Sequence, residues 1–279
     1  MEKVMSYKNL VVYLDPTGGN TRLLQVTSDL AAVFHASVMG ISARQPAQVV
    51  YMDGYVPSDL FERDHEDMRK AMATTEAEFR AALKPRIPVL TWRSNMLFGV
   101  VADYLAVESR TADLVIVGAG SNDWLNDYRV INVGDLVMQA GRPVLVVPEG
   151  VDGLQLECAL IAWKDSREAR RAIVAALPLL KHASRVDIVE VAVGEDTAAA
   201  HMRLVEVVGW LRSHGVEAQM RVVPATGDDA QALFTIAYEQ KADLIVAGAY
   251  GHSRLREWAL GGVTRELLQH SKCCVLLVH

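Results

Sequence analysis

The sequence predicts an α/β protein with two tandem, doubly wound domains, each built on a five-stranded parallel sheet. Short apolar runs alternate with segments of helical periodicity along the chain. Strands that alternate with helices are typical of parallel pairing through right-handed crossovers. The same order of elements also occurs twice, and several fragments recur at long range. These observations together favour a duplicated domain over one large domain.

The clearest repeat joins the ends of the two halves. ADLVIVGAG at Ala112–Gly120 is matched 130 residues later by ADLIVAGAY at Ala242–Tyr250. GRPVLVVP, which ends at Pro148, is matched 131 residues later by KCCVLLVH, which ends at His279. Self-similarity at a fixed long offset indicates duplication. We therefore expect domains at residues 1–150 and 151–279, joined by a short polar connector.

The beginnings of the halves lie further apart. LVVYLD at Leu10–Asp15 is matched by ALIAWK at Ala159–Lys164, which is 149 residues later. The first copy must therefore contain about 19 extra residues after its first strand. We expect them within Ala43–Asp67, where Pro46, Gly54 and Pro57 interrupt the periodicity.

In the first copy, buried-type apolar runs predict five strands and the segments between them predict four helices. The expected strands are Leu10–Leu14, Ser37–Ser42, Val89–Arg93, Asp113–Val117 and Pro143–Val147. The expected helices are Thr21–Phe34, Ser58–Leu83, Leu97–Ser109 and Gly134–Ala140.

The second copy has the same alternation. The expected strands are Cys158–Trp163, Val186–Ala192, Glu217–Val223, Asp243–Ala247 and Cys274–Val278. The expected helices are Ser166–Leu180, Ala198–His214, Asp229–Gln240 and Gly262–His270.

Glycines follow the fourth strand of the second copy. Gly248 and Gly251 precede a loop that reaches Gly261 and enters a helix. Ligands of doubly wound sheets bind beyond the carboxyl ends of the strands. Free backbone N–H groups and the positive end of a helix favour anions there, and glycine lets the backbone approach them closely. The alternative is that the glycines serve only a tight turn and close packing of helix on strand.

The spacing Gly248-x2-Gly251-x9-Gly261 resembles the nucleotide-binding signature of the universal stress protein family, whose fold is Rossmann-like and related to the adenine nucleotide alpha-hydrolases. Gly262 departs from the signature, which continues with Ser, Thr or Asn. The resemblance implies ATP or a related adenine nucleotide, with magnesium on the phosphates as a further option. The residues that it places at this ligand are Ala162, Trp163, Lys164, Asp165, Val191, Ala247, Gly248, Gly251, His252, Gly261, Gly262, Val263 and Thr264.

The turn after the first strand of the second copy departs from the family as well. Universal stress proteins carry Asp-Gly-Ser there, whereas this chain has Lys164-Asp165-Ser166. Asp165 could supply the carboxylate for the ribose, or Lys164 could face a phosphate. The alternative is that Asp165 or Ser166 simply caps the following helix. The resemblance places adenine near Val191.

The first copy has only part of this pattern. Asp15 is retained, but the position three residues after Gly118 is Ser121, and thirteen residues after Gly118 the chain has Ile131. A branched side chain would fill the space where the backbone must approach an oxyanion. We therefore expect the first domain to have a degenerate nucleotide site.

The composition of the chain limits the classes of molecule that we expect it to bind and the place where we expect it. The formal charge of −6 leaves no net basic field, which disfavours nucleic acid. No apolar run is long enough to predict a membrane span, and the three cysteines show neither a disulfide framework nor a metal-ligand spacing, so we expect a cytoplasmic protein without a metal site. The resemblance implies pairing of the two domains through their last strands, Val144–Val147 and Val275–Val278. A homodimer of such chains is left open.

Two classes of function follow. The first is a stress-response binding or signalling module that holds an adenine nucleotide in its second domain. The second is an enzyme, a slow magnesium-dependent ATPase, although no residue is placed as a general base and we assign no catalytic residue. A scaffold that binds no nucleotide is the third hypothesis, and Gly262 and Lys164 favour it.

Overall fold

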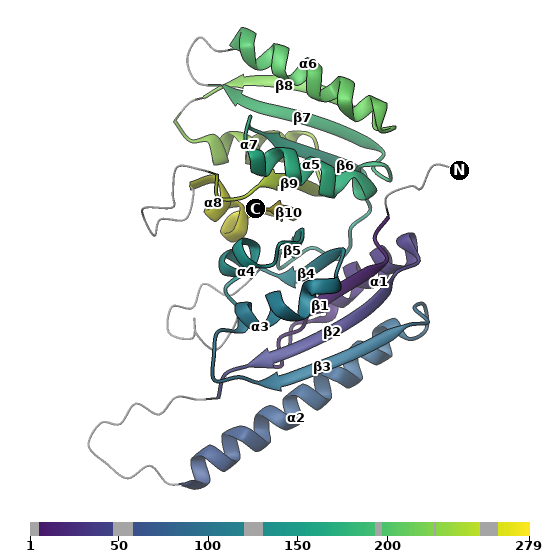
Figure 1. Cartoon of the computed structure of the whole chain (residues 1–279), viewed down its shortest axis with the longest axis vertical. Coiled ribbons are helices and arrows are strands. Elements are labelled where there is room, and N and C mark those ends of the chain that lie inside the picture. The colour runs from purple at the N-terminus through teal and green to yellow at the C-terminus, as the bar shows by residue number, and fades with distance from the viewer. Residues whose placement is uncertain (1–5, 47–57, 120–130, 193–196, 226, 252–261) are drawn as a thin grey trace, which may run out of the picture.

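The structure is a computed structural model that describes residues 6–46, 58–119, 131–192, 197–225, 227–251 and 262–279. Its strands form one ten-stranded sheet in the order β3-β2-β1-β4-β5-β10-β9-β6-β7-β8. Figure 1 shows the sheet running the length of the molecule, with helices on both faces and the long helix α2 at the opposite end from α6. No helix within the described ranges is long and apolar enough to cross a membrane.

In the described part of the first half, the strands are β1 to β5, and the helices are α1 to α4 together with the short 3-10 helix η1. The strands are β1 (Asn9–Tyr13), β2 (Ser37–Arg44), β3 (Leu90–Met96), β4 (Leu114–Gly118) and β5 (Val144–Val147). The helices are α1 (Thr21–Phe34), α2 (Ser58–Leu83), α3 (Val101–Glu108), η1 (Ser109–Thr111) and α4 (Val133–Gln139).

The second half repeats the order. Its strands are β6 (Cys158–Trp163), β7 (Arg185–Ala192), β8 (Gln219–Pro224), β9 (Leu244–Gly248) and β10 (Cys274–Val278). Its helices are α5 (Arg167–Leu180), α6 (Thr197–Ser213), α7 (Asp229–Glu239) and α8 (Gly262–His270). Within each half every strand pairing is parallel, as the alternation of strands and helices predicts.

Alternation along each strand divides the core into two apolar layers. In β1, Leu10 and Val12 face the layer that contains residues of α1, α2, α5 and α6. Val11 and Tyr13 face the other layer, which contains residues of α3, α4, α7 and α8. Side chains of a strand alternate between the faces of the sheet, so a strand covered on both faces must be apolar throughout. The sheet is therefore doubly wound.

The halves meet through β5 and β10, which pair antiparallel. Val275 lies opposite Val146, Leu276 opposite Leu145, and Leu277 opposite Val144. These strand residues are at most 1 % exposed. Because the ladder is continuous across this pair, the two five-stranded units form a single sheet with both layers of core shared between the halves.

The predicted fold class is confirmed, and the predicted helices and strands all occur, with differences at their ends. The range Ala43–Asp67, where the extra residues of the first half are expected, includes regular structure at both of its ends. Ala43 and Arg44 belong to β2, and Ser58–Asp67 belongs to α2. Helix α2 has 26 residues whereas its counterpart α6 has 17, so part of the extra length is helix.

Candidate functional site at the carboxyl ends of β6 and β9

The predicted site residues of the second half come from neighbouring strands. Ala162 of β6 lies opposite Ala247 of β9, so Trp163 and Gly248 end the two strands side by side. On the other flank Trp163 lies opposite Glu190 of β7, which places Val191 one residue further along the same rim. The structure thus brings together residues that are more than 80 positions apart in the chain.

The turn after β6 resolves one alternative from the sequence. The Ser166 hydroxyl oxygen accepts a hydrogen bond from the backbone N–H of Ala169 at 3.2 Å and caps α5. The carboxylate of Asp165 is exposed and accepts a hydrogen bond from Arg170 at 2.5 Å. Lys164 is also exposed. Ser166 is therefore the structural cap, while Lys164 and Asp165 lie on the surface at the rim.

Gly248 is required by packing within the protein. A Cβ at this position would lie 2.4 Å from the backbone nitrogen of Ala169 and 2.6 Å from the backbone carbon of Glu168. The end of β9 therefore lies directly against the first turn of α5, and a side chain larger than hydrogen would push them apart. This observation favours the packing interpretation for Gly248.

The other glycines of the loop have room around them. Gly251 is exposed, and a Cβ there would make ordinary contact, 3.4 Å from Oε2 of Glu168. Gly262 is exposed at the first residue of α8, with no atom within 4 Å of a built Cβ. Val263 is half-buried and Thr264 is buried. His252 and Gly261 lie outside the described residues.

Glu168 is the residue of this site that the sequence did not reveal. It stands in the first turn of α5, is 1 % exposed, and accepts hydrogen bonds at Oε1 from Arg167 at 2.9–3.0 Å. Its other oxygen, Oε2, has no hydrogen-bond partner in the part of the chain that the structure describes. Its only sign in the sequence is an acidic residue two positions after a helix cap, and that is equally typical of favourable interaction with a helix N-terminus.

Two further polar atoms are buried at this rim. The indole Nε1 of Trp163 and the hydroxyl of Tyr250 have no hydrogen-bond partner among the described residues. Burial, and to a lesser extent the charge of Asp135, raises the pKa of Tyr250 to about 12, so its phenol stays neutral at physiological pH. The backbone of Tyr250 has φ 55°, a conformation that is uncommon for a residue other than glycine.

At the corresponding rim of the first half, the carboxylate of Asp15 is engaged by neighbouring groups of the protein. Oδ1 of Asp15 accepts hydrogen bonds from the backbone N–H of Thr17 at 2.8 Å and from its hydroxyl at 2.6 Å. Arg44, at the end of β2, lies 3.4 Å from the same oxygen. Asp15, the residue of the family pattern that this half retains, is therefore already bound to groups of the protein. Ser121 lies outside the described residues.

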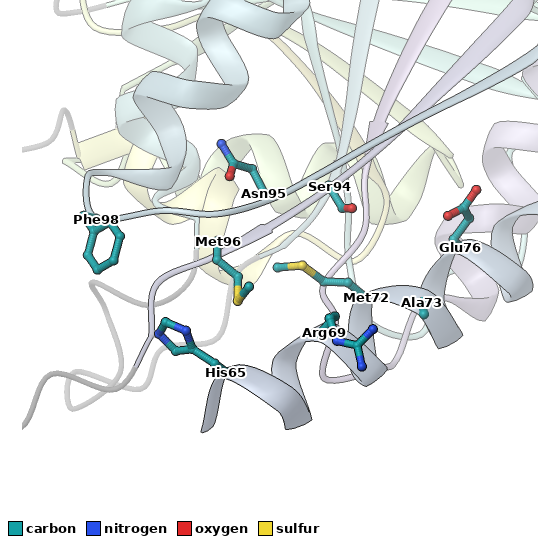
Figure 2. A pocket seen from close by; sticks show the side chains of 9 residues that line it. All are labelled: His65, Arg69, Met72, Ala73, Glu76, Ser94, Asn95, Met96 and Phe98. Carbon is teal, nitrogen blue, oxygen red and sulfur yellow. The ribbon is translucent and has the colours of Figure 1, made fainter. Parts of the chain in front are cut away.

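A separate cavity of about 480 Å³ lies between α2 and β3, at the edge of the sheet. Figure 2 shows Met72 of α2 and Met96 of β3 beside the space between these elements, with Phe98 at its margin. Phe98 is 90 % exposed. None of the predicted nucleotide-site residues lines this cavity, so it is a different surface of the molecule.

Within the described ranges no group of three or more His, Cys, Asp or Glu side chains is arranged to hold a metal ion.

The geometry defines a class of protein: two parallel α/β units joined through their last strands, with a glycine-bearing loop between the fourth strand and the last helix of the second unit. Residues 159–279 match the model of the universal stress protein family. The second half of the chain is therefore a universal stress protein domain.

Solved structures extend the likeness of fold to the whole chain. A universal stress protein from Archaeoglobus fulgidus DSM 4304 aligns with a TM-score of 0.76 and 15 % identity over 97 % of this chain and 95 % of that one. A protein described as a putative universal stress protein from Pseudomonas aeruginosa UCBPP-PA14 aligns with a TM-score of 0.67 and 12 % identity, covering 98 % and 93 % of the two chains. A search of the curated proteins finds no match.

Proposed function

We propose that the second half of the chain binds ATP or a related adenine nucleotide at the rim formed by β6, β7 and β9, and that the protein acts as a stress-response binding module. The observation that carries this proposal is the glycine arrangement around α8. Gly251 and Gly262 are exposed, and the space around Gly262 is open. A helix N-terminus with accessible N–H groups is suited to a phosphate.

The ends of the strands provide the remaining contacts in this proposal. Exposed Lys164 and Asp165 follow β6, and the half-buried Val191 lies on the neighbouring strand. Lys164 would interact with phosphate oxygens as a point charge, and Asp165 would accept a hydrogen bond from the ribose. The backbone near Val191 would contact adenine.

Isothermal titration calorimetry with ATP, ADP and AMP tests the proposal. We expect saturable binding of at least one of these nucleotides. Gly251→Val should abolish this binding and leave the circular dichroism spectrum unchanged, because Gly251 is exposed and its Cβ would make only an ordinary contact, 3.4 Å from Oε2 of Glu168. Ser121→Val, at the matching position of the first half, is the control and should bind like the wild type.

Phosphate release measured in the same samples distinguishes a binding module from the alternative of a slow magnesium-dependent ATPase. Multiple turnovers that require Mg²⁺ would show that the protein is an ATPase and would reject the hypothesis of a binding module without catalysis. If no adenine nucleotide binds, and none is found by mass spectrometry of the purified protein, the proposed nucleotide site is rejected.

Packing observations favour one other candidate, a scaffold without a nucleotide. Gly248 is explained by the close approach of α5, and the buried carboxylate of Glu168 lies beside Gly251. In that case the rim would be a structural remnant, as we propose for the first half, where Asp15 is engaged by Thr17 and Arg44.

A further inference from the structure

Glu168 carries a buried charge that is paired on one side only. Arg167 contacts only the Oε1 atom of Glu168, through its Nε and Nη2 nitrogens. The side chain of Arg167 is itself about half-exposed. Oε2 has less than 1 Å² of accessible surface and no hydrogen-bond partner among the described residues. A buried charged oxygen without a partner is costly, because it has lost its hydration without a replacement.

The carboxylate is nevertheless ionised at neutral pH. Burial acts to raise the pKa of Glu168, but the polar groups around it, which are its own backbone N–H, the Arg167 guanidinium and the Ser166 hydroxyl, together hold this pKa below its usual value. Its position in the first turn of α5 adds the favourable field of the helix N-terminus. The site therefore contains a permanent negative charge.

This charge lies directly against Gly248 and Gly251, which follow one another closely at the end of β9. A Cβ built on Gly251 would be 3.4 Å from Oε2, and the backbone of Glu168 is the surface against which Gly248 packs. Electrostatic repulsion does not require contact, because it decreases only with the first power of distance and is weakly screened where water is excluded. A phosphate held by the loop would experience this carboxylate.

We propose that Glu168 sets the charge selectivity of the rim, so that it favours adenosine or a monophosphate over a triphosphate without a counter-ion. This inference rests on the proposed function, since it concerns which adenine compound occupies the same site. The unpaired Oε2 opposes each additional phosphate charge, whereas it leaves the binding of the neutral nucleoside nearly unchanged. Lys164 is exposed at the rim and acts in the opposite direction.

The test measures affinities for adenosine, AMP, ADP and ATP in buffer with EDTA, so that no divalent cation neutralises the phosphates. For the wild type we expect affinity to fall from AMP to ATP. For Glu168→Gln we expect the affinity ratio of ATP to adenosine to increase at least about tenfold, equivalent to about 1.4 kcal/mol. The ratio is unaffected by any inactive fraction of the variant.

Glu217→Gln is the matched control, because it removes one negative charge just before β8, at the amino ends of the strands. The ratio of its ATP affinity to its adenosine affinity should change by less than about twofold, since an exposed charge at the opposite ends of the strands is screened by solvent. An unchanged ratio in Glu168→Gln, an equal change in both variants, or wild-type affinity that rises from AMP to ATP would overturn the inference. Absence of binding by every compound to every variant would instead reject the proposed function, and this inference with it.

Discussion

The hydroxyl of Tyr7 donates a hydrogen bond to the backbone carbonyl of Ala175 at 2.7 Å, across 168 positions of the chain. Tyr7 precedes the first strand, whereas Ala175 lies in α5 of the second half. The ring of Tyr7 also packs edge-on against Phe34, whose ring contacts His182 in the same way. The helices of the two halves are thus held together on one face of the sheet in addition to the β5–β10 ladder.

Tyr7→Phe should lower the free energy of unfolding by about 1 kcal/mol, because it removes a buried hydrogen bond and keeps the ring. Tyr238→Phe is the control, since Tyr238 is 87 % exposed, and it should change stability by less than about 0.5 kcal/mol. Urea denaturation followed by tryptophan fluorescence measures both. Equal stability of the two variants would show that the contact between Tyr7 and Ala175 contributes nothing.

Gly248→Ala should destabilise the protein by about 1–3 kcal/mol even without a ligand, because its Cβ would meet the backbone of α5 at 2.4 Å. Gly209→Ala provides the comparison. Gly209 is exposed within α6 with no atom near a built Cβ, so alanine should stabilise that helix by about 0.5–1 kcal/mol. Thermal denaturation of the two variants should give shifts of opposite sign, and an unaltered melting temperature for Gly248→Ala would contradict the packing account.

Leu276→Ala should cost about 2–5 kcal/mol, because Leu276 is fully buried opposite Leu145 in the ladder that joins the halves. Val205→Ala, on the exposed face of α6, should change stability by less than about 0.5 kcal/mol. Guanidinium denaturation measures the difference. A small loss for Leu276→Ala would mean that the junction is loosely packed.

The thiols should react slowly in the folded protein. Burial raises the pKa of Cys273 to about 11 and also raises those of Cys158 and Cys274. At pH 8 only about one Cys273 in a thousand is then a thiolate, the reactive form. Reaction with a disulfide reagent should accelerate about tenfold per pH unit between pH 8 and 10, whereas the denatured protein should react rapidly at pH 8. Fast labelling of the native protein at pH 8 would contradict this burial.

The fold was predictable where apolar periodicity is strong, and less so where it is weak. Strand β3 continues to Met96, beyond the expected end at Arg93, because its polar residues pair with β2 at the edge of the sheet and need no buried face. Helix α3 begins at Val101, later than expected. Phe98, which lies within the expected helix, precedes the observed start and is almost fully exposed.

The candidate site was also predictable from the sequence only in part. The position of the ends of β6 and β9 on one rim followed from parallel topology, which gathers strand ends at one edge, whereas their direct pairing is a finding of the structure. The role of Glu168 did not follow, because it depends on the distance between α5 and the end of β9, and these segments are about 80 residues apart. Sequence spacing contains no measure of such an approach, and it also did not decide between Asp165 and Ser166 as the cap.

Each of the two apolar layers contains residues from both halves of the chain. A chain cut between β5 and β6 would leave each piece with one side of the ladder uncovered and large apolar faces open to water. Such fragments would either reassociate in a one-to-one complex or aggregate. We therefore expect the two units to unfold as one cooperative body, although the sequence presents them as two.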